Sequence, residues 1–310
     1  MNDSFQRKIT DNSRKIINKI ESKHHGKLKY ILFYKYLKFI LNNDFKRIDE
    51  LPVKNMGLNK EIPFRFWMMW WQDLDKAPEI VRKNISFIRK LMGEKNVIII
   101  TKDNYKDYTN ISPTLIQKLN QGKISLTNWS DIIRFHLLKE NGGYWIDSTV
   151  AISPLFKEFL LSKRDSTFIT LCESNFNYHN ISYNQWTGWL MGGVANFELF
   201  EYACKFYDHY FENHDMIIDY FLIDDIISHY YKINPNFRLL CNNCKKDWKP
   251  YYWSDNLSSS FDKDMIKKFN TQLEYSIQKL TYKYNSKILV QSDSLLVWLL
   301  KSDSWKEVKC

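Results

Sequence analysis

Two carboxylates and a guanidinium group stand at suggestive spacing in the middle of this sequence. Asp131 and Arg134 are three residues apart in a segment with helical period, so their side chains can meet on one face of a helix. Further along, Asp147 and Thr149 follow a short apolar segment. A carboxylate with a hydroxyl suits a Mg²⁺ or Mn²⁺ ion that also holds phosphate oxygens, because these hard cations prefer oxygen ligands. The spacing therefore indicates metal and phosphate chemistry.

A helix is predicted to carry the first pair. Residues 128–140 place Ile132, Ile133, Leu137 and Leu138 on one apolar stripe. The residues that could cap its start are Thr127, Asn128 and Ser130. Asn141-Gly142-Gly143 is predicted to end it, since these residues tolerate positive φ.

A short strand is predicted to carry the second pair. Tyr144 to Ile146 would deliver Asp147, Ser148 and Thr149 to its carboxyl end, where ligands bind in open α/β sheets. The alternative is structural: Asp147 caps the next loop, and Asp131 and Arg134 form a surface ion pair.

Taken together, the string S-D-x-x-R…L-L…G-G-x-x-x-D-x-T resembles the sugar-nucleotide signature of the bacterial capsular polysaccharide glycosyltransferases. These belong with a wider DxD-type group that includes yeast initiating mannosyltransferases and the glucosylating clostridial toxins. The resemblance runs from about Ile62 to Phe156. The chain departs from the wider pattern at Thr149, which replaces the second carboxylate and is a weaker metal ligand.

The resemblance implies an activity, a fold and partners. The activity is that of a metal-dependent, retaining hexosyltransferase, which moves galactose or glucose from a UDP-sugar and forms an α-linkage. The acceptor is a saccharide linked to undecaprenyl diphosphate, used in capsular polysaccharide biosynthesis. The implied fold is α/β, with a GT-A-like (Rossmann-like) nucleotide-sugar-binding domain.

The resemblance also implies roles for individual residues. Asp131, Arg134 and Asp147 are the expected catalytic residues, with Asp131 and Arg134 holding the hexose hydroxyls. Asp147 and Thr149 are the expected ligands of Mn²⁺ or Mg²⁺. The nucleotide-sugar is expected to contact Trp70, Gln72, Asn104, Ser130, Asp131, Arg134, Trp145 and Lys279. Lys279 belongs to a K-L-T-Y-K segment that resembles one closing over the donor in the capsular enzymes.

The chain before the central stretch reads as alternating strands and helices. The segment from Ile62 to Gln72 is predicted to be a buried strand. In the resembling family a similar strand ends in a tryptophan that reaches the base, which implies that Trp70 stacks on uracil. Trp71 points to the opposite face and would then belong to the core. A helix to about Met92 and a strand at 96–101 follow. With the helices near 113–120 and 128–140, this order predicts a βαβ series. Asp103 and Asn104 would face the nucleotide, or else form an Asx turn.

The C-terminal half reads as mostly helical. Helices are predicted at 154–161, 196–213 and 215–231, and strands at 166–173 and 278–283, with a polar loop over 245–265. Asp224 and Asp225 lie in the last of these helices, either facing the sugar or solvated on the helix surface. Two parts are expected, an N-terminal helical extension over 1–60 and the glycosyltransferase domain over 61–310.

The N-terminal extension is basic as well as apolar. Between Lys27 and Leu41, lysines alternate with large apolar groups. Such a helix could lie on an anionic membrane surface, or it could pack on its own domain with lysines outward.

Composition limits the remaining choices. The 310 residues are 44% hydrophobic and 26% charged, as in ordinary globular proteins, and the net charge of +10 favours acidic partners. We expect a cytoplasmic protein, peripheral on the inner face of the plasma membrane, because no signal peptide or spanning segment is evident. A nucleic-acid-binding protein and a non-catalytic assembly factor are the alternatives. No nucleic-acid-binding motif is found, so nucleic acid is not an expected partner.

Overall fold

The computed structural model describes residues 3–21, 27–51, 61–174, 177, 180–302 and 305, and of residues 17–21 and 27–29 only the backbone. The expected boundary near residue 60 therefore borders a segment outside the described residues.

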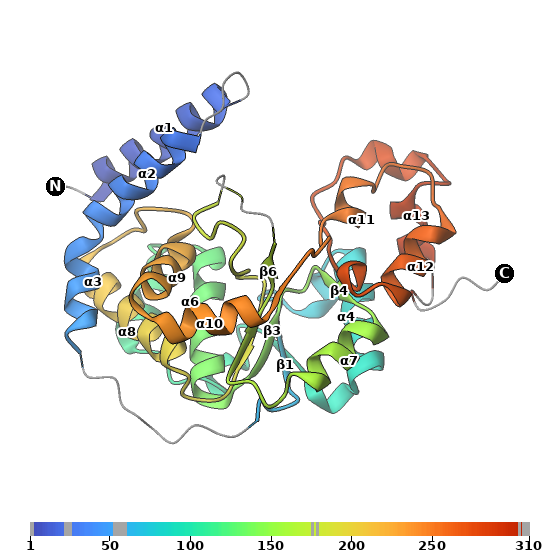
Figure 1. The fold of residues 1–310 in the computed structure, drawn as a ribbon, viewed down its shortest axis with the longest axis horizontal. Coiled ribbons are helices and arrows are strands. Elements are labelled where there is room, and N and C mark those ends of the chain that lie inside the picture. The colour runs from blue at the N-terminus through green and yellow to red at the C-terminus, as the bar shows by residue number, and fades with distance from the viewer. Residues whose placement is uncertain are drawn as a thin grey trace.

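A five-stranded mixed sheet in the order β2-β1-β3-β7-β5 forms the centre of the molecule (Figure 1). Its strands are β1 (Phe66–Met69), β2 (Val97–Ile100), β3 (Gly143–Ile146), β5 (Phe168–Thr170) and β7 (Leu190–Gly193). The neighbours β2, β1 and β3 are parallel, whereas β7 is antiparallel to both β3 and β5. Because β1 and β3 are parallel, the residues that follow them meet at one edge of the sheet.

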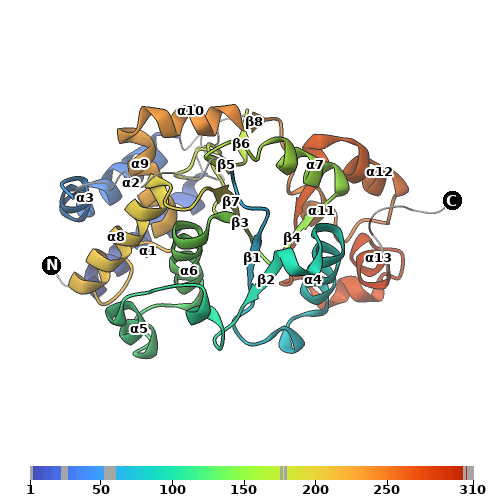
Figure 2. The ribbon, with the colours of Figure 1, turned by 90° about the horizontal axis from the view of Figure 1, so that it is seen from below.

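Helices cover both faces of this sheet (Figure 2). The helices α6 (Leu126–Asn141), α8 (Glu198–Asn213) and α9 (Leu222–Ile233) lie on one side. The helices α4 (Glu79–Met92) and α7 (Pro154–Ser162) lie on the other side. The apolar strands are buried between these layers, as expected for parallel strands covered on both faces. The remaining helices of the main body are α5 (Pro113–Asn120) and α10 (Pro235–Asn243).

A C-terminal helical lobe stands beside α4 (Figures 1 and 2). It contains α11 (Tyr252–Asp255), α12 (Lys263–Thr271) and α13 (Leu295–Lys301). An antiparallel pair, β4 (Val150–Ile152) and β9 (Ile277–Lys279), joins this lobe to the segment directly after β3. A second small pair is formed by β6 (Cys172–Glu173) and β8 (Lys245–Lys246).

Three helices form the N-terminal part: α1 (Asp3–Glu21), α2 (Lys27–Ile40) and α3 (Asn42–Asp49). The helices α1 and α2 form a hairpin that projects from the body (Figure 1). In α2, Tyr30, Phe33, Tyr34 and Leu37 are buried in a small core of their own with Ile181. The helix α3 differs, because its apolar side chains join the main core and pack on α8.

The sequence predicted most of these elements, and the helical content of the N-terminal part and of the C-terminal half is confirmed. The predicted helix at 215–231 begins later, at Leu222, because 214–221 forms turns in which Asp215 pairs with Lys118 and Lys123. The predicted strand at 166–173 is two strands, β5 and β6, which belong to different sheets. The loop predicted at 245–265 contains β8, α11 and the start of α12.

The turn between α6 and β3 requires glycine. Gly143 has φ +96°, and a Cβ there would lie 2.6 Å from the carbonyl oxygen of Arg65. The preceding residue, Gly142, has φ +64°, and its carbonyl oxygen accepts a hydrogen bond of 2.8 Å from the indole N–H of Trp67. The turn thus sets the helix that carries Asp131 against the strand that leads to Asp147.

Gly143→Ala should lower the free energy of unfolding by about 2–4 kcal/mol, since it adds backbone strain to a collision with a carbonyl oxygen. Gly122→Ala is the matched control: Gly122 has φ +70°, but its Cβ would have no neighbour within 4 Å. Urea denaturation of both variants measures the difference. Equal losses would contradict the close approach at Gly143.

Candidate functional site

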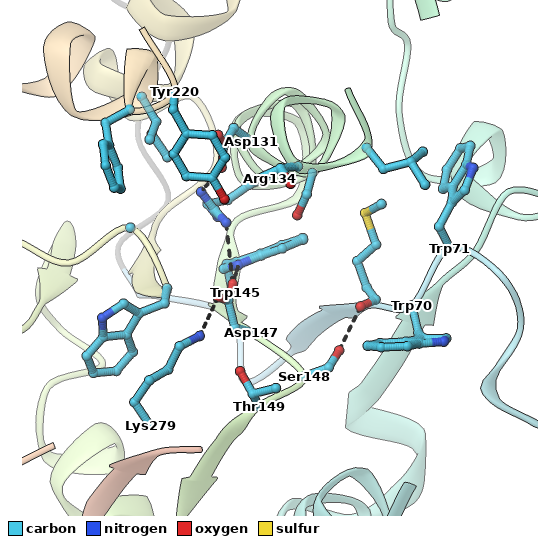
Figure 3. A pocket seen from close by; sticks show the side chains of 18 of the residues that line it. Trp70, Trp71, Asp131, Arg134, Trp145, Asp147, Ser148, Thr149, Tyr220 and Lys279 are labelled. Carbon is cyan, nitrogen blue, oxygen red and sulfur yellow. Dashed lines mark hydrogen bonds and ion pairs between the residues drawn. The ribbon is translucent and has the colours of Figure 1, made fainter. Parts of the chain in front are cut away.

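A cavity of about 580 Å³ opens at the carboxyl edge of β1 and β3 (Figure 3). Its volume lies in the usual range for small-molecule sites. Its walls come from segments that are distant in sequence: the ends of β1 and β3, one side of α6, the loop before β7, the start of α9 and the strand β9. The lining residues are Met69, Trp70, Trp71, Gln72, Leu126, Thr127, Ser130, Asp131, Arg134, Trp145, Asp147, Ser148, Thr149, Gly188, Trp189, Tyr220, Phe221, Ile223, Asp224, Lys279 and Tyr282.

Helix α6 positions Asp131 and Arg134 in this cavity. The helix begins earlier than predicted, at Leu126, and its cap is Ser125, whose hydroxyl accepts a hydrogen bond from the backbone N–H of Asn128. Arg134 Nη1 donates to Asp131 Oδ1 at 2.7 Å, and both side chains are buried. The alternative of an exposed ion pair is therefore wrong.

The β3–β4 turn positions Asp147. The backbone N–H of Asp147 donates to the carbonyl oxygen of Trp189, and its own carbonyl oxygen accepts from Val150. Next to it, the hydroxyl of Ser148 donates to the carbonyl oxygen of Met69 at 2.7 Å, which ties this turn to β1. The aspartate thus stands on a rigid segment rather than on a free loop.

The carboxylate of Asp147 receives three donors (Figure 3). Its Oδ1 accepts from the indole N–H of Trp145 at 2.8 Å and from Arg134 Nη2 at 3.4 Å. Its Oδ2 accepts from Lys279 Nζ at 2.7 Å. The guanidinium of Arg134 also lies over the Trp145 ring, 4.7 Å from its centre. Two cations and an indole therefore converge on one carboxylate at the cavity wall.

These contacts have opposite effects on the two carboxyl groups. Burial raises the pKa of Asp131 to about 7, although the ion pair with Arg134 lowers it. Burial also acts to raise the pKa of Asp147, but Lys279 and Arg134 outweigh it and hold that pKa below its ordinary value. Near neutral pH the carboxyl group of Asp147 is thus ionised, whereas that of Asp131 is at a pH close to its own pKa.

The aromatic pair after β1 differs from the expectation. Both Trp70 and Trp71 line the cavity and both are half-buried, so Trp71 is not simply a core residue. Trp70 makes an edge contact with Tyr282, and its indole N–H has no hydrogen-bond partner among the described residues. Trp71 packs instead on Tyr105 and Trp129.

The structure gathers most of the residues that the sequence indicated. Trp70, Gln72, Ser130, Asp131, Arg134, Trp145, Asp147, Thr149 and Lys279 all line the one cavity. Asn104 does not, because its side-chain oxygen accepts from the backbone of Thr101 and its amide donates to the carbonyl oxygen of Ile99. The side chain of Asn104 is therefore held within its own loop, by bonds to residues that precede it rather than by an Asx turn.

The sequence did not indicate the part of the wall made by Tyr220, Phe221 and Ile223, and it left Asp224 open between facing the sugar and being solvated. Asp224 is not solvated on the helix surface: its Oδ1 accepts from the indole N–H of Trp186 at 2.8 Å, and the residue lines the cavity. Burial raises its pKa to about 6. The adjacent pair Asp224-Asp225 drew attention to this position in the sequence. The turns at 214–221 then place the start of α9, and with it Asp224, at the cavity.

The side chains that could ligate a metal decide which metal ions the site can hold. Among the residues that the structure describes, no three His, Cys, Asp or Glu side chains gather as metal ligands. Asp147 and Thr149 supply one carboxylate and one hydroxyl at the same wall. Mg²⁺ commonly takes one or two carboxylates, with water and substrate phosphates completing its shell. The residues therefore fit a metal ion that a phosphorylated ligand helps to hold.

The raised pKa of Asp224 makes a pH-dependent prediction. The folded protein binds this proton more tightly than the unfolded chain, so ionisation of Asp224 lowers the free energy of unfolding as pH rises from about 4 to about 6. Asp224→Asn removes this loss. Relative to wild type, the variant should gain about 1–2 kcal/mol over that interval, with allowance for the partial exposure of the group. Urea denaturation at each pH measures it, and a constant difference would contradict the buried ionisation.

The geometry can now be set beside known proteins. A family model described as "Capsular polysaccharide synthesis protein" matches residues 12–297, from within α1 into α13. No curated protein and no solved structure matches the chain significantly. The resemblance to the capsular polysaccharide enzymes is thus confirmed at the level of the family, and the match extends well beyond Ile62 to Phe156. This chain belongs to the capsular polysaccharide synthesis protein family.

Proposed function

We propose that this chain is a retaining glycosyltransferase with a GT-A-like fold, which transfers galactose or glucose from a UDP-sugar during capsule biosynthesis. The observation that carries the proposal is the partly buried charge network of Asp131, Arg134, Asp147 and Lys279, placed at the carboxyl edge of parallel strands. Ligands bind at that edge in open α/β sheets. Family membership supports the capsule role, and the mixed α/β architecture is compatible with the fold.

The proposed roles follow from where each group stands. A nucleotide-sugar donor presents a base, a ribose, a diphosphate and a hexose. Trp70, whose side chain lines the cavity, is proposed to contact the base through its aromatic ring. Asp131 and Arg134, held together deep in the cavity, are proposed to bind the hexose hydroxyls. Trp145 is proposed to act by fixing Asp147 and Arg134 in place.

Departure of the diphosphate is the step that needs most electrostatic stabilisation, because negative charge gathers on it. Asp147 and Thr149 are proposed to hold Mn²⁺ or Mg²⁺ together with the diphosphate. When bound, the ion supplies positive charge to the leaving group. Arg134 and Lys279 provide positive charge at the same wall, in a partly buried environment where charges interact more strongly than in water.

The test of this function is a panel of UDP- and GDP-sugars with Mn²⁺, scored for hydrolysis to the free hexose. Turnover of a UDP-hexose supports the proposal. No turnover, together with a salt-dependent shift of a DNA or RNA probe, would favour nucleic-acid binding. No turnover and no binding of any nucleotide would favour a non-catalytic assembly role.

Arg134→Ala should lower the hydrolysis rate by two or more orders of magnitude, because it leaves Asp131 and Asp147 without the charge they share. The same change removes a partner from a buried pair, so a stability loss of about 3–5 kcal/mol is expected as well. Asp147→Asn keeps the shape of the side chain and should abolish turnover at a smaller cost in stability. Rates are compared at a temperature where both variants are folded, and near wild-type turnover of Asp147→Asn would contradict the site.

We further propose that the α1–α2 hairpin rests on an anionic membrane surface, where a lipid-linked acceptor would lie. No described helix is long and apolar enough to cross a membrane. In α2, the side chains of Tyr30 and Phe33 pack on the protein, so they do not face outward as an interfacial helix would require. The side chains of Lys27, Leu28 and Lys29 lie outside the described residues.

The outward face of the hairpin nevertheless carries exposed apolar groups. Leu32 and Phe39 are 55% and 81% exposed on the face of α2 opposite its small core, beside exposed Lys35. On α1, Phe5 and Ile16 are both 56% exposed. Apolar groups flanked by lysines are typical of helices that lie in a membrane interface.

Binding to liposomes that contain phosphatidylglycerol should weaken when Leu32 and Phe39 are both changed to Ser, and it should fade with added salt, because each lysine near such a surface contributes roughly 1 kcal/mol. Co-sedimentation measures it. The matched control changes Leu239 and Val290, which are 61% and 85% exposed elsewhere, to Ser. Point changes are preferred to truncation because α3 belongs to the main core. Binding that ignores both salt and the Leu32/Phe39 change would contradict the proposal.

A further inference from the structure

The two oxygens of the Asp147 carboxylate have different partners. Oδ1 is used by Trp145 and Arg134, which are both fixed by the buried side of the site. Oδ2 accepts only from Lys279 Nζ, at 2.7 Å, among the described residues. A metal ion that binds Oδ2 would therefore lie close to the Lys279 ammonium, which already neutralises this oxygen.

The backbone of Lys279 is fixed, but its side chain has room to move. In the β4–β9 pair Lys279 stands opposite Val150, and the next residue, Leu280, donates to the carbonyl oxygen of Thr149 at 2.7 Å. The side chains of Lys279 and Asp147 are 21% and 29% exposed and both line the cavity. A lysine ammonium on a flexible four-carbon stem can thus exchange partners without any movement of the strand.

A divalent cation and the ammonium of Lys279 compete for Oδ2, because like charges in a partly buried site repel each other. A diphosphate changes this balance, since it offers the ammonium an anionic partner of its own. Once Lys279 turns to the diphosphate, Oδ2 becomes free for the metal ion, which the diphosphate also attracts.

We propose that Lys279 is a catalytic residue that exchanges from Asp147 to the donor diphosphate, so that nucleotide and metal ion bind cooperatively. This inference rests on the proposed function of the site. It assigns to Lys279 two successive tasks: it closes Asp147 to cations before the donor arrives, and it then adds positive charge at the leaving group. By linkage, UDP must raise the affinity for the metal by the same factor by which the metal raises the affinity for UDP.

The test measures binding, not turnover. Free Mn²⁺ is followed by electron paramagnetic resonance during titration of the protein with and without UDP, and UDP affinity is measured by calorimetry with and without Mn²⁺. In wild type, Mn²⁺ should bind at least tenfold more tightly with UDP present. In Lys279→Met, which keeps the length of the side chain but not its charge, Mn²⁺ should bind at least tenfold more tightly than in wild type without UDP. The coupling between UDP and Mn²⁺ should shrink accordingly.

Three further variants make the result specific. Lys279→Arg keeps the positive charge and should keep the weak Mn²⁺ binding of the UDP-free protein. Lys283→Met removes an exposed lysine four residues along the same segment, outside the cavity, and should match wild type throughout. The single variant Asp147→Asn should lack tight Mn²⁺ binding in the presence of UDP. The double variant Asp147→Asn/Lys279→Met should lack it in the absence of UDP.

The outcomes separate this inference from the proposed function. If wild type binds UDP and Mn²⁺ together but Lys279→Met gains no Mn²⁺ affinity without UDP, the exchange is overturned and the proposed function stands. If Mn²⁺ and UDP bind independently in wild type, the exchange is also overturned. If wild type binds no UDP at all, the proposed function fails, and this inference fails with it.

Discussion

A single buried guanidinium joins the parts of this site. Arg134 is almost fully buried, and a charge in that position is tolerated only where partners compensate for the water it has lost. Its partners are Asp131 on the same helix and Asp147 at the end of β3. Asp147 in turn binds Lys279, which stands on β9 near the C-terminus. Two consecutive elements, α6 and β3, and the distant strand β9 are therefore held in one arrangement by shared charge.

The same arrangement explains why the two carboxyl groups behave differently. Asp131 shares Arg134 and has no second cation, so burial dominates and raises its pKa to about 7. Asp147 has a second cation in Lys279, and its pKa stays below the ordinary value. One member of the network is thus close to titration near neutral pH, while the other is a persistent anion. The site therefore combines a carboxyl group that can exchange its proton near neutral pH with one that keeps its negative charge.

The sequence predicted those features that depend on neighbouring residues, and it did not predict those that depend on contacts between distant parts of the chain. The helix, the glycine turn and the strand around Asp147 follow from helical period, from the φ values that glycine allows and from an apolar run. The structure forms all three, although the helix begins earlier, at Leu126, and has Ser125 as its cap. Lys279 was reached only by resemblance, since nothing local says that β9 pairs beside β4. Asn104 was misassigned because its side chain is used by its own loop. The position of Asp224 depends on the preceding turns, where Asp215 pairs with Lys118 and Lys123 from another part of the chain. No local sequence pattern around Asp224 predicts those ion pairs.

The central claim is that a nucleotide diphosphate binds at the carboxyl edge of β1 and β3, beside Asp147. A crystal structure of the protein with UDP and Mn²⁺ tests this most directly. The account predicts diphosphate density in the cavity next to Asp147 and Lys279, with the uracil ring on the side of Trp70. Ordered UDP elsewhere on the molecule, with the cavity at Asp147 filled only by water, would contradict it.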